Sequence, residues 1–123
     1  MGEKIKQKVL IVDDNSDHCE ILKHCLQENY DIDIALGGEE AIAKIYNFEP
    51  VLILLDIMMP RLTGDELVKM IKAWKPNIQV IMVSAHLIPE VKEECMQNGA
   101  FDCICKPVDF ELVRQTVIRA LKQ

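Results

Sequence analysis

The sequence lacks both a membrane segment and a secretion signal. No apolar run approaches the ~20 residues that a bilayer-spanning helix needs. The first residues, MGEKIKQ, contain no apolar signal core. The five cysteines are odd in number, include no Cys-x-x-Cys pair and fit reduced thiols that pack as small hydrophobic groups. We therefore expect a cytoplasmic protein with no membrane partner.

Several common ligand motifs are also missing. There is no glycine-rich phosphate loop of the GxxxxGKS/T or GxGxxG kind, which disfavours nucleotide binding. Acidic residues outnumber basic residues by 20 to 14, so a direct nucleic-acid partner is not expected. No acid or cysteine completes a metal-ligand spacing around His18 or His24, so we expect both histidines at a helix surface.

The segments that are present predict one α/β domain. The chain of 123 residues is long enough for a single core and contains no linker or repeat. Residues 51–60, VLILLDIMMP, form a continuous apolar run between two prolines, which predicts a strand buried on both faces. Strands alternating with amphipathic helices predict a parallel sheet covered on both sides. The expected strands are residues 8–14, 31–36, 51–56, 78–84 and 101–105.

Local signals mark the helices between these strands. Thr63 and Asp109 are placed to cap the third and fifth helices, while Pro89 and Gly99 fit the start and the end of the fourth. Apolar residues at helical spacing predict the buried face of each helix. In the first and third helices these faces are Ile21, Leu22, Cys25 and Leu26, and Leu67, Met70, Ile71 and Trp74.

Polar residues stand at four of the predicted strand ends. They are Asp13 with Asp14, then Asp56, Ser84 and Lys106. In a parallel sheet these ends share one edge, where open α/β sheets bind ligands. Alone, each residue is more simply a turn, cap or surface residue, but their coincidence argues against chance. Three clustered carboxylates favour Mg²⁺, and an acid flanked by a hydroxyl and an ammonium suits an aspartyl-phosphate nucleophile.

Four segments resemble the response-regulator receiver domain of two-component signalling. They are VLIVDDN at residues 9–15, LLDIMMP at 54–60 followed by Gly64, VIMVSAH at 80–86 and GAFDCICKP at 99–107. Each segment is weak alone, but their order and spacing are specific, and the resemblance covers essentially the whole chain. It implies a flavodoxin-like (βα)5 three-layer sandwich with the parallel sheet order 2-1-3-4-5. It also implies a single receiver domain over residues 1–123, with its core at about 7–122.

The resemblance also implies a function and a set of roles. Asp56 would accept a phosphoryl group from the phosphohistidine of a sensor histidine kinase or phosphotransfer protein. Ser84 and Lys106 would hold the phosphoryl oxygens. The domain would signal to a downstream effector and would catalyse only its own phosphorylation and dephosphorylation. The implied Mg²⁺ ligands are Asp14, Asp56 and the Met58 carbonyl, with Asp13 acting through water.

Other positions would tune this switch. In receivers, the side chains at Met58 and His86 flank the path of the hydrolytic water. Cys103 stands where the family usually has Tyr, Phe or His, a ring that moves together with the hydroxyl at Ser84 and reshapes the face of the fourth helix, fifth strand and fifth helix. Phe101, expected on the same strand face, is an alternative ring. The Lys106-Pro107 bond is often cis in such domains.

Two alternative functions remain. A haloacid-dehalogenase type of phosphatase would need a second acid two residues after the nucleophile, where this chain has Met58, and it would need a cap insertion. A receiver-like domain that binds partners without phosphorylation is the other alternative, and the complete acidic set argues against it. The cognate kinase, the output and the oligomeric state, including a dimer formed on phosphorylation, cannot be read from the sequence. The domain could be stand-alone or part of a larger regulator or hybrid kinase.

Overall fold

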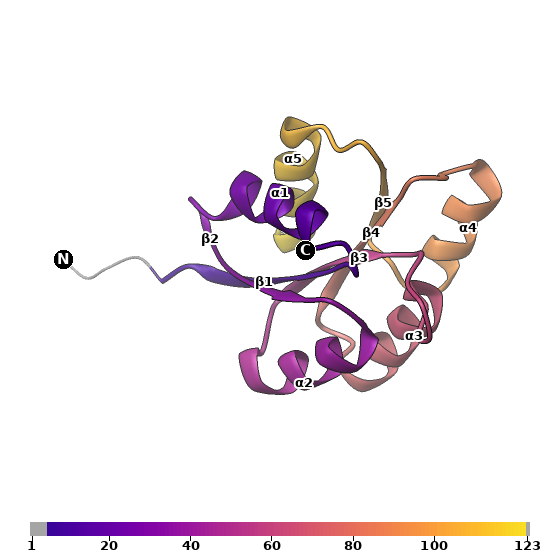
Figure 1. Ribbon diagram of the computed structural model, residues 1–123, viewed down its shortest axis with the longest axis horizontal. Coiled ribbons are helices and arrows are strands. Elements are labelled where there is room, and N and C mark those ends of the chain that lie inside the picture. Colours follow the sequence, from indigo (N-terminus) through magenta and orange to yellow (C-terminus); the bar gives the residue numbers. More distant parts are fainter. Residues whose placement is uncertain (1–4, 123) are drawn as a thin grey trace.

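The computed structural model describes residues 5–122, in which five strands alternate with five helices (Figure 1). The strands pair in parallel in the order β2-β1-β3-β4-β5, so the predicted sheet order is confirmed. The elements are β1 (Gln7–Val12), α1 (Ser16–Leu26), β2 (Tyr30–Ala35), α2 (Gly38–Phe48), β3 (Leu52–Asp56), α3 (Gly64–Trp74), β4 (Gln79–Ser84), α4 (Pro89–Gln97), β5 (Asp102–Cys105) and α5 (Phe110–Leu121).

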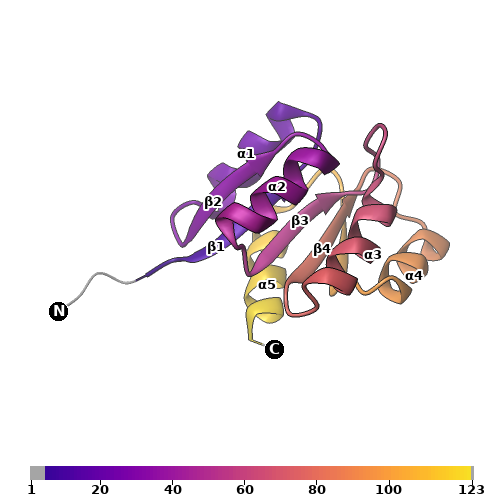
Figure 2. The same ribbon diagram turned by 90° about the horizontal axis from the view of Figure 1, so that it is seen from below.

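The helices form a layer on each face of the sheet. Helices α1 and α5 cover one face, and α2, α3 and α4 cover the other (Figures 1 and 2). The apolar residues of β3 alternate between these layers: Leu52 and Leu54 pack towards α1 and α5, whereas Ile53 and Leu55 pack towards the other three helices. All four side chains are at most 1% exposed, which confirms that β3 is buried on both faces. The central strand therefore fixes where its terminal acid, Asp56, emerges.

The helix starts follow from local hydrogen bonding. The Thr63 side chain accepts the N–H of Glu66, whose own carboxylate accepts the N–H of Thr63, so α3 begins with a capping box. Asp109 caps α5, and Pro89 opens α4 as predicted. Gly99 follows α4 with φ +106°, a left-handed conformation that favours glycine.

Some sequence predictions were wrong in detail. Ile21, Met70 and Trp74 are 42–46% exposed, because the apolar stripes of α1 and α3 are wider than the strips that touch the sheet. Strand β1 ends at Val12, so Asp13 and Asp14 lie in the following loop. The described part of the chain, residues 5–122, contains no helix that is both long and apolar enough to span a membrane.

Candidate functional site

The site is built at the carboxyl edge of the sheet, where the loops after β1, β3, β4 and β5 meet. Asp56, the last residue of β3, is 6% exposed, and its Oδ1 accepts the Met58 N–H at 3.3 Å. A Cβ atom on Gly64 would overlap the Asp56 carbonyl oxygen and lie 2.7 Å from the Ile57 Cα. Glycine at position 64 therefore lets the start of α3 pack closely against the end of β3.

Three carboxylates converge here, as predicted. Oxygen atoms of Asp13, Asp14 and Asp56 all lie within 4.8 Å of one another. Asp13 is buried and its Oδ1 accepts the Asn15 N–H at 2.9 Å, whereas Asp14 is exposed to solvent. The site thus has two buried acids and a third acid at its opening.

Lys106 supplies the opposite charge. Its Nζ lies 3.1 Å from Asp13 Oδ2 and 3.6 Å from Asp56 Oδ1, and its side chain is 17% exposed. The Lys106 backbone N–H donates to the Ser84 carbonyl at 2.8 Å. The Lys106-Pro107 peptide bond is cis. Lys106, the residue after β5, thereby places its ammonium beside Asp56 at the end of β3 and Asp13 in the loop after β1.

Ser84 ends β4 and is 2% exposed. Its Oγ accepts the His86 N–H at 3.1 Å, which leaves the hydroxyl hydrogen free to donate to another acceptor. In the β3–β4 register Asp56 pairs with Val83, so Ser84 is the next residue along the neighbouring strand. The side chains of Met58 (68% exposed) and His86 lie in solvent on the loops after β3 and β4.

The acids differ in their pKa values. Burial raises the pKa of Asp56 to about 6, the negative charge of Asp13 adds to this effect, and Lys106 and the Met58 N–H oppose it. Burial also raises the pKa of Asp13, but hydrogen bonds from Asn15 and Lys106 outweigh burial, and the pKa lies below its ordinary value of 3.8. Asp13 therefore holds its charge more firmly than Asp56, which is the harder of these two acids to ionise in the folded chain.

His18 belongs to this site, although its spacing in the sequence gave no indication of a ligand. Its side chain is 42% exposed, yet its Nδ1 lies 3.0 Å from Lys106 Nζ and 3.4 Å from Asp13 Oδ2. The place of His18 in the sequence, shortly after the acid pair, could have indicated that it lies near the site. The first turn of a helix directly after a β1 acid pair lies above the same sheet edge.

Cys103 is 7% exposed and packs on the side of α2, α3 and α4, in the same cluster as Cys95. Phe101 instead packs with the α1 and α5 cluster, where the Arg119 guanidinium lies 5.9 Å from its ring centre. The prediction that Phe101 shares a face with Cys103 was wrong. Strand β5 begins only at Asp102, so residue 101 lies outside the two-residue alternation.

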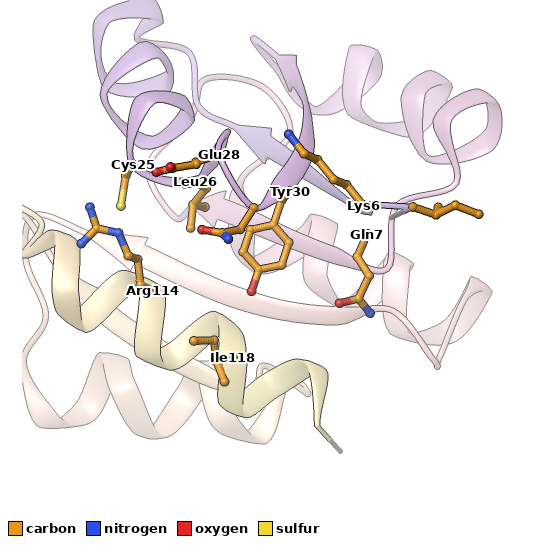
Figure 3. A pocket seen from close by; sticks show the side chains of 10 residues that line it. Lys6, Gln7, Cys25, Leu26, Glu28, Tyr30, Arg114 and Ile118 are labelled. Carbon is orange, nitrogen blue, oxygen red and sulfur yellow. The ribbon is translucent and has the colours of Figure 1, made fainter. Parts of the chain in front are cut away.

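Two pockets help to delimit the site, one at the opposite end of the sheet and one beside Lys106. A pocket of about 400 Å³ lies at the opposite end of the sheet, where Gln7 and Tyr30 begin β1 and β2 and Arg114 approaches from α5 (Figure 3). It is therefore remote from Asp56. An apolar hollow of about 270 Å³ adjoins Lys106 and separates α1 from the loop after β5. It is lined by His18, Ile21, Leu22, Val83, Lys106, Pro107 and Val108.

Residues 9–118 match the family model of the response regulator receiver domain. The chain belongs to this family. The receiver is 33% identical over 117 residues to the transcriptional regulatory protein ZraR of Salmonella typhimurium, covering 94% of this chain and 26% of that protein. It is 35% identical over 115 residues to a cyclic di-GMP phosphodiesterase of Thermotoga maritima, covering 93% of this chain and 31% of that protein. The chain thus spans between a quarter and a third of these curated relatives.

Solved receiver structures resemble the whole domain. The chemotaxis protein CheY4 of Vibrio cholerae has a TM-score of 0.89 at 31% identity, covering 94% of this chain and 99% of that one. In the CheX–CheY–BeF3–Mg²⁺ complex of Borrelia burgdorferi, the matching chain has a TM-score of 0.88 at 34% identity, with coverages of 94% and 89%. The predicted flavodoxin-like fold and the assignment to two-component systems are confirmed. Receivers are generally signalling modules that interact with histidine kinases and effector domains and bind Mg²⁺ in an acidic pocket.

Proposed function

We propose that this receiver accepts a phosphoryl group on Asp56, in a Mg²⁺-dependent reaction, from the phosphohistidine of a sensor histidine kinase or phosphotransfer protein. One observation carries the proposal. Asp56 is a buried carboxylate between an acidic pair, Asp13 and Asp14, and the ammonium of Lys106 at 3.6 Å. This arrangement offers a nucleophile, a cation site and a positive group for phosphoryl oxygens in one place.

The side chains account for the transfer. An oxygen of Asp56 attacks phosphorus, the new O–P bond forms as the P–N bond breaks, and the donor imidazole leaves with the bonding electron pair and takes up a proton. The Lys106 ammonium balances the negative charge of the phosphoryl oxygens. The Ser84 hydroxyl, which already accepts the His86 N–H, donates its own hydrogen to one of those oxygens.

The donor set fits Mg²⁺. It consists of hard oxygen ligands whose spacing, up to 4.8 Å, is compatible with one ion that keeps several waters. Asp14, Asp56 and the Met58 carbonyl would hold the ion directly, and Asp13 would act through water. When bound, Mg²⁺ supplies positive charge that offsets the acids and orients phosphoryl oxygens.

The output would come from the face formed by α4, β5 and α5. Lys106 hydrogen-bonds to Ser84, so a movement of Ser84 towards the phosphoryl group would pull on β5. Asp102 of β5 lies 3.9 Å from Lys92 of α4 and 3.5 Å from Arg119 of α5. These ion pairs connect the three elements, and a shift of β5 would change the surface that they offer to an effector.

The test is intact-mass measurement after incubation with Mg²⁺ and acetyl phosphate. The wild type should gain one acid-labile phosphoryl group. Asp56→Asn should gain none, and Asp14→Ala should gain little because it lacks a cation ligand. Asp31→Asn, an exposed acid on β2, is the control and should be labelled like the wild type. Full labelling of Asp56→Asn would refute the assignment, and no labelling of the wild type would favour an interaction domain without phosphorylation.

A further inference from the structure

The contact between His18 and Lys106 has no part in the phosphorylation scheme above. His18 is in the first turn of α1, and its Nδ1 lies 3.0 Å from the Lys106 ammonium nitrogen. The His18 backbone N–H is used separately, as a donor to the Asn15 side chain. The side chain is therefore not needed for the helix cap, and its position at Lys106 requires another explanation.

The short distance to an ammonium group favours one form of the imidazole in this contact. An ammonium group has three donors and no acceptor, so a nitrogen 3.0 Å away must accept. His18 Nδ1 is therefore the unprotonated nitrogen and Nε2 carries the hydrogen. This Nδ1 also lies 3.4 Å from Asp13 Oδ2, a second acceptor. Two acceptors this close repel unless they share a donor, and the Lys106 ammonium, 3.1 Å from Asp13 Oδ2, is that donor.

The geometry gives hydrogen-bond partners to two of the three N–H groups of Lys106. One donates to Asp13 Oδ2 and one to His18 Nδ1, which leaves one for the Asp56 side. Asp56 Oδ1 is 3.6 Å away, just outside hydrogen-bonding distance, so the third N–H is not consumed. A lysine head group on a flexible four-carbon stem is poorly fixed by a single partner. Two partners, Asp13 and His18, fix the ammonium better than one would and leave its third donor available to Asp56.

We propose that His18 is a positioning residue for phosphoryl acceptance: its neutral imidazole holds the Lys106 ammonium against Asp13 so that one N–H group faces Asp56. The inference rests on the proposed role of Asp56 and Lys106. It extends that proposal to a residue of α1, because His18 is not one of the acids, the hydroxyl or the lysine to which the phosphorylation scheme assigns a part. Without the imidazole, Lys106 samples other rotamers and meets the incoming phosphoryl oxygens less often.

The kinetic test compares two nearly isosteric substitutions. Asn places its Oδ1 on the same branch as His18 Nδ1 and can accept from Lys106, whereas Leu cannot. With acetyl phosphate and Mg²⁺, His18→Leu should slow labelling by about threefold to tenfold, the effect of losing one hydrogen bond of ordinary strength. His18→Asn should stay within about twofold of the wild type. His24→Ala, an exposed histidine on the same helix, is the matched control and should not change the rate. Urea unfolding of each variant confirms that it is folded.

A spectroscopic test works without phosphorylation. Imidazole ¹⁵N spectra recorded at about pH 8 should show His18 with hydrogen on Nε2 and an accepting Nδ1. Lys106→Met should abolish the hydrogen-bond shift of Nδ1 without changing His24. The proposal is overturned if His18 carries hydrogen on Nδ1, if His18→Leu labels like the wild type, or if His18→Asn is as slow as His18→Leu. Absence of labelling in the wild type would instead count against the proposed function, and the spectra would still decide the contact.

Discussion

Replacing Asp56 with Asn should stabilise the metal-free protein at neutral pH. Burial and the charge of Asp13 raise the pKa of Asp56 from its ordinary 3.8 to about 6, so ionising this acid is harder in the folded chain than in the unfolded chain. Asparagine removes that charge but keeps an oxygen that can accept the Met58 N–H. The expected gain comes from removing a buried charge, a change that would sacrifice the proposed role of Asp56.

The size of this stabilisation and its pH dependence follow from the linkage between proton binding and folding. A pKa raised from 3.8 to about 6 corresponds to about 3 kcal/mol of lost folding free energy at any pH above both values. Below pH 3.8 the carboxyl group is protonated in both states, and the variant gains nothing from this source. Between these values the folded state holds a proton that the unfolded state has released. Wild-type stability therefore falls as pH rises, and the advantage of Asp56→Asn grows to its full size above pH 6.

Urea unfolding in EDTA between about pH 4 and pH 8 measures this difference. At pH 8 the midpoint of Asp56→Asn should lie roughly 1 to 3 M above that of the wild type, given ordinary urea slopes. Added Mg²⁺ should reduce the gap, because it stabilises the wild type by mass action. Asp31→Asn, on the exposed side of β2, should show no comparable gain. An advantage that is equal at pH 4 and pH 8, or a less stable variant at pH 8, would refute the reasoning.

Three further predictions concern the loop after β3, the start of α3 and strand β5. Met58 is 68% exposed and apolar and cannot orient water, so the phosphorylated form should decay slowly. The phosphorylated form of Met58→Asn should decay faster than that of the wild type. A slower decay of this variant would contradict the idea that Met58 shields the phosphoryl group. His86→Ala, measured alongside, shows by its direction whether that imidazole shields the phosphoryl group or positions water. Gly64→Ala should lower the free energy of unfolding by about 1–3 kcal/mol and impair labelling, because the added Cβ meets the Asp56 carbonyl. Gly37→Ala is the control and should lose less stability, because a Cβ there meets no atom within 4 Å. Cys103→Tyr should enlarge the amide-shift changes across α5 on adding fluoroberyllate and Mg²⁺, and equal changes in the wild type would show that the missing aromatic does not matter.

The sequence was sufficient for those parts of the site that strand topology determines. Each chemically distinctive residue follows directly on a buried apolar run, and parallel pairing brings such ends together whatever the details of packing. For this reason Asp13, Asp56, Ser84 and Lys106 could be predicted to converge before any distance was known.

Features that depend on helix orientation could not be predicted in this way. The contact of His18 with Lys106 requires the rotation of α1 about its axis, which is set by packing of Cys19 and Leu22 against the sheet. Phe101 was misplaced because the alternation of faces begins only where pairing begins, at Asp102. Trp74 continues an apolar stripe but is the last residue of its helix, and its side chain stays 42% exposed.

The charges of the site explain why stability and chemistry are coupled there. Three carboxylates face a single ammonium, and the pKa of Asp56 stays raised even though Lys106 is 3.6 Å away. Burial is the largest cause of this raised pKa and the charge of Asp13 adds to it, so Lys106 does not cancel the two effects. The clustered negative charge disfavours the folded chain, and the same cluster would favour binding of a divalent cation. A cation that relieves this repulsion lowers the pKa of Asp56 and keeps it ionised, which is the form that can attack phosphorus.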